Sequence, residues 1–212
     1  MKNKTNYLIA IVYIINAVCF CTYGQEAGSF TDDRNDKVYK TVKINDQVWM
    51  GENLAFKTES GCWVYDDIKD YVKTHGYLYS WKTATKACPA GWRLPSMQDW
   101  WYLSAYLGGD DQAGGKLKET GTTSWKSPNT GATNSSGFTA LSSGRSGDKN
   151  MENIGNVTFF WTNVDDDDIT SWCAALYSSK RELSLFPTDK KDGYSVRCIK
   201  ISDKDQKNFD FW

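Results

Sequence analysis

The segment from Tyr79 to Leu107 predicts two short helices joined by a rigid turn, and it constrains the fold more than any other part of the chain. Pro89 and Gly91 separate the two helical patterns. Ser96 is a good N-cap for the second helix, because the carboxylate of Asp99 can meet the free N–H groups of its first turn. Helical spacing places one apolar face on each helix, formed by Trp81, Ala84, Ala87 and Cys88, and by Trp100, Leu103 and Leu107.

Alternating apolar and polar residues predict β-strands on both sides of the two helices. The alternation runs from Val38 to Val48, with Asn45 and Asp46 as the turn of a β-hairpin. Further strands are expected over Cys62–Tyr65, Val157–Val164, Trp172–Tyr177 and Tyr194–Ile201. The domain is therefore expected to combine these strands with the two helices.

The N-terminus has the layout of a secretory signal peptide over residues 1–24. A basic start precedes an apolar run from Leu8 to Cys21, and a small residue, Gly24, offers a cleavage site. The run is short for a membrane span and contains Asn16, so we expect no membrane span in the mature chain. An uncleaved anchor and a lipid anchor on a cysteine of this run are the lesser alternatives. The expected location is therefore secreted or cell envelope.

Composition favours one domain after the signal peptide. The polar residues 25–36 are expected to form a flexible leader, residues 37–200 the domain, and residues 201–212 a C-terminal tail. A formal net charge of −1 gives no electrostatic reason to expect a nucleic-acid partner. Ten tryptophans and twelve tyrosines are many for this length. Most should lie in the core, and a few exposed ones could stack on sugar rings or on a protein.

The segment 108–155 holds ten of the seventeen glycines, interleaved with Ser, Thr and Asn. Four apolar residues punctuate it, which predicts a long loop pinned to the domain by apolar anchors. Long ordered loops on a rigid scaffold often carry binding sites. The expected anchors are Leu117, Trp125, Phe138 and Leu141.

Four cysteines follow the signal peptide, namely Cys62, Cys88, Cys173 and Cys198. An even number in an exported chain predicts disulfides, and the sequence leaves three connectivities open. A zinc site is disfavoured because no two cysteines have CxxC spacing and the chain has one histidine, His75.

No local pattern nominates catalytic residues. His75 stands alone and is more simply a surface residue than a general base, and no glycine loop has the order of a phosphate cradle. The acidic run from 165 to 168 could hold calcium through Asp165, Asp166 and Asp168, since carboxylate oxygens are calcium ligands. Its spacing matches no calcium loop, so a solvated hairpin tip is the preferred interpretation and calcium the alternative cofactor.

Five motifs, in order, give the chain a family resemblance. The chain resembles the Fibrobacter succinogenes major paralogous domain family over about residues 36–200, and the GWRLPS motif of that match indicates that Trp92 is buried. The matching motifs are VYKTVKINDQVWMGENL (Val38–Leu54), GYLYSWKTA (Gly76–Ala84), CPAGWRLPSMQDW (Cys88–Trp100), FFWTN (Phe159–Asn163) and YSVRCIK (Tyr194–Lys200).

A more distant resemblance is to the C-type lectin-like fold, and it implies the α+β class, with two short helices packed on small antiparallel sheets and long irregular loops. It implies a disulfide between Cys88, at the end of the first helix, and Cys198, in the last strand. The remaining pair would be Cys62 and Cys173. The sulfatase-modifying oxidases share a lectin-like fold and similar motifs, but their chemistry needs a reactive cysteine where a structural bridge at Cys198 is the better explanation.

These features together predict a secreted or cell-surface binding module that is not an enzyme. Its partner would be a glycan or an envelope or surface protein. One alternative is a structural envelope or adhesin component that assembles through an apolar patch. A second alternative is a carboxylate-dependent hydrolase, which requires two facing carboxylates that no sequence pattern identifies.

Overall fold

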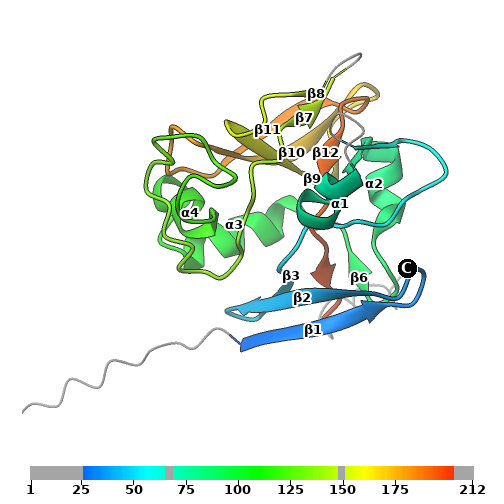
Figure 1. The fold of residues 1–212 in the computed structure, drawn as a ribbon, viewed down its shortest axis with the longest axis horizontal. Helices are drawn as coiled ribbons and strands as arrows, with labels where there is room; N and C mark the ends of the chain where they lie inside the picture. The colour runs from blue at the N-terminus through cyan, green and yellow to red at the C-terminus, as the bar shows by residue number, and fades with distance from the viewer. Residues whose placement is uncertain (1–25, 65–68, 148–150, 203–212) are drawn as a thin grey trace, which may run out of the picture.

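The computed structural model describes residues 26–64, 69–147 and 151–202, and this part of the chain is a mixed α+β structure with four helices and three sheets (Figure 1). The predicted signal peptide over residues 1–24 lies outside the described residues, as do residues 203–212 of the predicted tail. The predicted class is therefore confirmed at the α+β level.

A five-stranded sheet forms one side of the molecule, at the bottom of Figure 1. Its central pair is the predicted hairpin, in which residues 45 and 46 form the turn and Thr41 pairs with Met50. The strand order is β1 (Glu26–Asp32), β2 (Lys37–Ile44), β3 (Gln47–Met50), β13 (Ile199–Lys200) and β6 (Trp92–Arg93).

Strand β1 corrects the expectation of a flexible leader over residues 25–36. Residues Glu26–Asp32 pair antiparallel with β2 along their whole length. The ring of Phe30 stacks on Tyr39 and Trp92, with ring centroids 5.4 and 4.3 Å apart. The polar side chains of β1 do not show the apolar alternation of a strand, because most of them face solvent and backbone pairing stabilises the strand.

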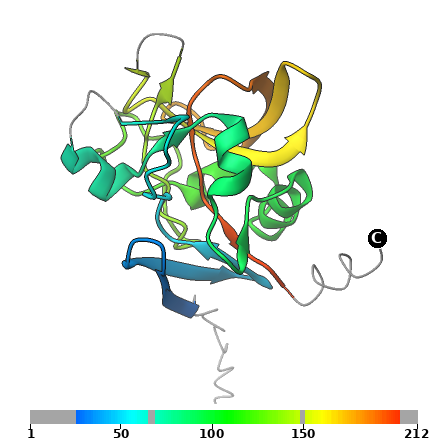
Figure 2. The same ribbon diagram turned by 90° about the vertical axis from the view of Figure 1, so that its right-hand side faces the viewer.

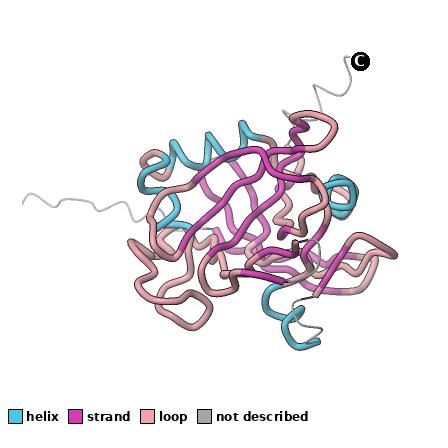
Figure 3. Tube along the Cα trace, turned by 90° about the horizontal axis from the view of Figure 1, so that it is seen from above, coloured by secondary structure: helices cyan, strands magenta, loops and turns pink. Residues whose placement is uncertain are grey.

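A six-stranded sheet forms the second layer, seen at the top of Figure 1 and from above in Figure 3. The predicted strands near residues 157–164 and 172–177 are its long central hairpin. The sheet order is β11 (Ser184–Asp189), β10 (Thr170–Tyr177), β9 (Val157–Asp165), β12 (Tyr194–Ser195), β5 (Leu78–Tyr79) and β4 (Cys62–Trp63). A separate two-stranded sheet pairs β7 (Arg145–Ser146) with β8 (Met151–Glu152).

The last predicted strand, Tyr194–Ile201, is two strands on different sheets. β12 belongs to the six-stranded sheet and β13 to the five-stranded sheet. Between them the backbone carbonyls of Val196 and Cys198 accept hydrogen bonds from the N–H groups of Leu54, at 2.8 Å, and Met50, at 3.0 Å. This extended segment therefore runs through the core and ties the two sheets together (Figure 2).

Both helices predicted from Tyr79 to Leu107 are present, as α2 (Trp81–Ala87) and α3 (Met97–Tyr106). Two more helices, which the sequence analysis did not identify, are α1 (Lys69–His75) and α4 (Asp110–Leu117). The apolar face of α3 packs into a cluster with Trp49 and Phe160 that lies between the two large sheets.

The predicted cap of α3 is formed. The Asp99 N–H donates to Ser96 Oγ at 3.2 Å, and the Ser96 N–H donates to Asp99 Oδ2 at 2.6 Å. Arg93 adds a two-pronged ion pair to the same carboxylate, with N–O distances of 2.6 and 3.1 Å. Trp92, expected to be buried, is only half-buried, because it lies on the edge strand β6, with Phe30 stacked on its ring.

We expect Ser96→Ala to lower the free energy of unfolding by about 1 kcal/mol, because the first-turn N–H of Asp99 loses its acceptor. Urea denaturation followed by circular dichroism measures this loss. Thr120→Ala removes a hydroxyl from an exposed loop position and should change stability by less than about 0.5 kcal/mol. Equal losses for the two variants would show that the cap does not stabilise α3.

The glycine-rich segment contains helix α4 near its start, so the prediction of a long loop over residues 108–155 is wrong at that point. Three of its four predicted anchors, Leu117, Trp125 and Phe138, are buried, while Leu141 is half-buried. Gly114 and Gly115 lie within α4 because a side chain there would collide with the backbone carbonyls of Glu182 and Gly131. The glycines thus allow α4 to approach its neighbours closely.

Candidate functional site

The outward side of α3 carries exposed aromatic side chains. Trp101, Tyr102 and Tyr106 retain 55%, 62% and 47% of their accessible surface, although α3 is otherwise a core helix. Gln98 and Ala105 are the other exposed residues of this helix. We call these five positions the α3 face. Large aromatic rings left in water are uncommon unless they meet a ligand or a partner.

No residue of the α3 face is charged, although 24% of the chain is. The Gln98 side-chain amide donates to Tyr102 Oη at 3.1 Å, which adds a polar edge to the aromatic surface. Residues four apart on a helix lie about 6 Å from each other, so the rings of Tyr102 and Tyr106 are neighbours. The face thus offers flat apolar rings with hydroxyl and amide groups at their edges.

The α3 face stands on a rigid support. Directly beneath it, Trp100 and Leu103 are buried, and Trp100 packs on Trp49 with ring centroids 4.9 Å apart. The capping contacts of Ser96 and Asp99 fix the start of the helix. Because the support is already ordered, little conformational freedom is lost when the outer rings bind a ligand.

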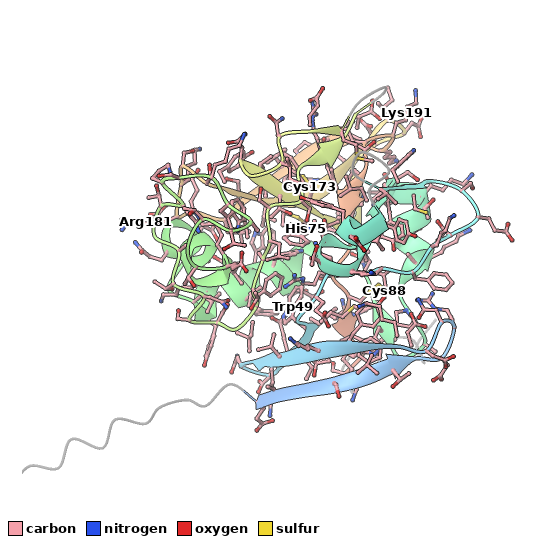
Figure 4. All side chains as sticks on the ribbon, in the orientation of Figure 1. Trp49, His75, Cys88, Cys173, Arg181 and Lys191 are labelled. Carbon is pink, nitrogen blue, oxygen red and sulfur yellow. A yellow bond between two sulfur atoms is a disulfide. The ribbon has the colours of Figure 1, made fainter. Side chains whose placement is uncertain are left out.

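The disulfide implied for Cys88 and Cys198 is present, and it ties the end of α2 to the segment between β12 and β13. Figure 4 shows Cys88 between the helix and the lower sheet. Cys198 is fully buried, so this cysteine has a structural role rather than that of a reactive thiol.

The second implied pair is wrong, because Cys62 and Cys173 are both free thiols. Cys62 lies on β4, at one edge of the six-stranded sheet, and Cys173 on β10, with β9, β12 and β5 between them. Four strand spacings of about 4.8 Å place the two strands roughly 19 Å apart across the sheet, whereas disulfide-bonded cysteines have Cα atoms within about 7 Å of each other. Burial raises the pKa of the Cys173 thiol, so it stays protonated.

The acidic run closes the β9–β10 hairpin, in agreement with the preferred interpretation. Asp165 forms an ion pair with Lys190 at 2.5 Å, and Asp166 accepts hydrogen bonds from the side chains of Thr170 and Trp172. The carboxylates therefore serve the turn. The structure does not gather Asp165, Asp166 and Asp168 into a calcium site, and no group of metal ligands occurs among the described residues.

His75 is half-buried at the end of α1, in contrast to the predicted surface position (Figure 4). Its ring stacks on Tyr71 with centroids 3.9 Å apart and an angle of 9° between the planes. Burial lowers the pKa of His75 to about 4, so the imidazole is neutral at pH 7. Its Nδ1 lies 2.8 Å from Thr74 Oγ1.

The sequence patterns did not predict two buried cations, Lys118 and Arg197. Lys118 is fully buried, and its ammonium donates to the backbone carbonyls of Thr130, Tyr177 and Lys180 at 2.7 to 3.0 Å. Burial lowers the pKa of Lys118 to about 8. Arg197, also fully buried, donates to Asn53 Oδ1. Both cations donate hydrogen bonds to backbone carbonyls of the 108–155 segment, so their role is to stabilise the fold.

No helix in the described part of the chain is long and apolar enough to cross a membrane. The Cys88–Cys198 disulfide is consistent with an extracytoplasmic location, since disulfides persist in oxidising compartments.

The molecule is thus a disulfide-tied α+β domain that displays an uncharged aromatic surface on one helix. A model of the Fibrobacter succinogenes major domain matches residues 42–200, and the chain belongs to that family. The match lies within the predicted domain, 37–200. Searches of curated proteins and of solved structures found no match.

Proposed function

We propose that the chain is a non-enzymatic binding module whose ligand is a neutral glycan held by the α3 face. The observation that carries the proposal is the group of three exposed aromatic rings on one rigid, uncharged helix surface. Sugar rings present C–H groups that stack on aromatic faces, and their hydroxyls bond to groups at the ring edges. Tyr102 and Gln98 supply such groups.

The size of the α3 face favours a glycan over a large protein partner. A fully buried aromatic side chain contributes about 150–250 Å², so three half-exposed rings offer roughly 300 Å². A stable protein–protein interface needs about 800 Å² from each partner. The absence of charge on the face gives no reason to expect an acidic or basic ligand.

We also propose that the domain has the C-type lectin-like fold. The Cys88–Cys198 bridge, from the end of a helix to the last part of the domain, is the one that this fold implies. The order of α2, the turn at residues 88–95 and α3 supports the same proposal. With the predicted export signal, it favours action outside the cytoplasm, as a secreted or cell-surface protein.

A structural envelope component is the second candidate, and the same observation favours it. Exposed aromatic area of a few hundred Å² also suits self-assembly with other copies or with an envelope protein. The two candidates differ in one measurable property, because assembly predicts oligomers whose population rises with protein concentration.

Affinity electrophoresis in gels containing a neutral β-glucan, mannan or xylan tests the proposed function. We expect at least one polysaccharide to retard the wild-type chain, and Trp101→Ala to reduce the apparent affinity about tenfold or more through loss of a stacking ring. Trp63→Ala is the matched control, because Trp63 is an exposed tryptophan on β4, away from α3.

Retardation that is equal for Trp101→Ala and wild type would contradict a role for the α3 face. Sedimentation velocity over a range of concentrations separates the two candidates. A monomer that binds a polysaccharide supports the glycan proposal, whereas oligomers that Trp101→Ala dissolves, without any glycan binding, support assembly.

A further inference from the structure

A hollow of about 520 Å³ opens beside α1, away from the α3 face. Tyr71 and His75 line one side, residues 122–127 line another, and Ile154 with Gly155 closes it. Pockets that bind small ligands have volumes of about 300–1,000 Å³, so this hollow has room for one sugar ring.

One wall of the hollow is formed by two aromatic rings that stack face to face on each other, so only their outer faces and edges are open to a ligand. Tyr71 and His75 are one helical turn apart and stack nearly parallel. The Thr74 hydroxyl lies 3.2 Å from the Tyr71 carbonyl and 2.8 Å from His75 Nδ1. In either tautomer of the neutral imidazole, Nε2 can form a hydrogen bond with a ligand hydroxyl, which both donates and accepts.

The facing wall is rich in hydroxyl groups. Thr122, Thr123 and Ser127 are exposed, and their hydroxyls form no hydrogen bond within the described part of the chain. The Ser124 hydroxyl accepts the Ser142 N–H at 2.9 Å and fixes this part of the wall. Hydroxyls both donate and accept hydrogen bonds, as sugar hydroxyls do.

The backbone of this wall is held in place before any ligand arrives. Trp125 is buried, and its indole N–H donates to the Ala140 carbonyl at 2.8 Å. The N–H of Lys126 donates to the Gly155 carbonyl at 2.7 Å, which joins the two sides of the hollow. A wall that is ordered in advance costs little to bind.

Charge narrows the class of ligand. Among the described residues that line the hollow, none is acidic, and the one charged side chain, Lys126, is exposed, so solvent screens its attraction for an anionic ligand. A cationic ligand has no counter-charge there, and an apolar ligand would leave the hydroxyls of residues 122–127 without partners. An aromatic wall opposite a hydroxyl wall fits a polyhydroxylated ring.

We infer that this hollow is a binding site for a single neutral hexose unit, which packs against an outer face of the stacked Tyr71–His75 pair and bonds to the hydroxyls of residues 122–127. The site does not depend on the proposed function of the α3 face. It adds a pocket for one sugar residue to a surface suited to an extended chain.

Amide chemical-shift mapping of the full chain with methyl glucoside, methyl galactoside and methyl mannoside tests the inference. We expect at least one of them to shift amides of residues 71–75, 122–127 and 154–155, with a dissociation constant of about 1 mM. The double variant Thr122→Val/Thr123→Val should weaken binding about tenfold through loss of two hydrogen bonds. Thr120→Val, at an exposed position outside the hollow, should bind as wild type does.

An amide spectrum that is unchanged away from the hollow shows that the variants fold. Trp101→Ala should leave hexoside binding unaltered, so failure of the α3 proposal and failure of this one are distinguishable. Absence of shifts at about 50 mM hexoside, shifts confined to α3, or binding of glucuronate without binding of any hexoside would each overturn the inference.

Discussion

Replacing both Cys88 and Cys198 by alanine should lower the free energy of unfolding by about 4–5 kcal/mol. The bridge closes a loop with a sequence separation of 110 residues, and the chain-entropy model assigns a large stabilisation to a loop of that length. The bridge also fixes α2 against the segment that connects the two large sheets. Urea denaturation of the oxidised wild type and of the double variant measures the difference.

Cys62→Ala is the matched control, because Cys62 is a half-buried free thiol at a sheet edge. Cys62→Ala should lower the free energy of unfolding by about 1 kcal/mol or less. A reducing agent should destabilise the wild type and leave the Cys88→Ala/Cys198→Ala variant unchanged. Peptide mapping that finds Cys62 linked to Cys173 would contradict the strand order of the six-stranded sheet.

The sequence predicted those elements that combine an apolar face with a local cap or turn signal. Helix α3 is one example, because Ser96 and Asp99 mark its start and Trp100 and Leu103 mark its buried face. The hairpin of β2 and β3 is another, with its turn at residues 45 and 46. In such elements pattern and packing agree.

Non-local pairing is where sequence analysis failed. The order of the six-stranded sheet places β4 and β10 far apart, and nothing in the neighbourhood of Cys62 or Cys173 reports that order. Strand β1 is polar because it lies at an edge, so its alternation is weak. Sheet order depends on contacts between distant segments, and period-two patterns do not encode it.

The sequence indicated features from which the candidate sites are built, but not the positions of the residues that form them. The excess of aromatic residues favoured core positions for most rings and left a few exposed rings as the alternative, and segment 108–155 was predicted as a long loop of the kind that often carries a binding site. Helical spacing did place Trp100 on the buried face, but only the structure shows that its neighbour Trp101 joins Tyr102 and Tyr106 in an uncharged exposed surface. The hollow also needs α1, which lies far from residues 122–127 in sequence.

Arg197 was missed because its environment consists of neutral oxygens. Its guanidinium donates to Asn53 Oδ1 at 2.8 and 3.1 Å, to the Thr139 carbonyl at 3.4 Å and to the Phe138 carbonyl. It also lies over the Phe138 ring, 4.3 Å from the centroid. Burial lowers the pKa of Arg197 to about 9, which still leaves it charged at neutral pH.

Asn53 is oriented for this contact. Its side-chain N–H₂ donates to the His75 carbonyl at 2.9 Å and to Ser143 Oγ at 3.0 Å, so its oxygen faces Arg197. Arg197 and Asn53 therefore join the segment between β12 and β13 to α1 and to the 108–155 segment. This hydrogen-bond network stabilises the domain only while each buried acceptor keeps its donor.

Arg197→Ala should lower the free energy of unfolding by about 4 kcal/mol, because it leaves a cavity and removes the donor from two buried acceptors, Asn53 Oδ1 and the Phe138 carbonyl, and from the half-buried Thr139 carbonyl. Arg197→Lys keeps the charge but loses the planar fork, and should cost about 2 kcal/mol. Arg181→Ala removes an exposed arginine (Figure 4) and should cost less than about 0.5 kcal/mol. Urea denaturation of the three variants gives the ranking, and a loss below about 1 kcal/mol for Arg197→Ala would show that water replaces the guanidinium at no cost.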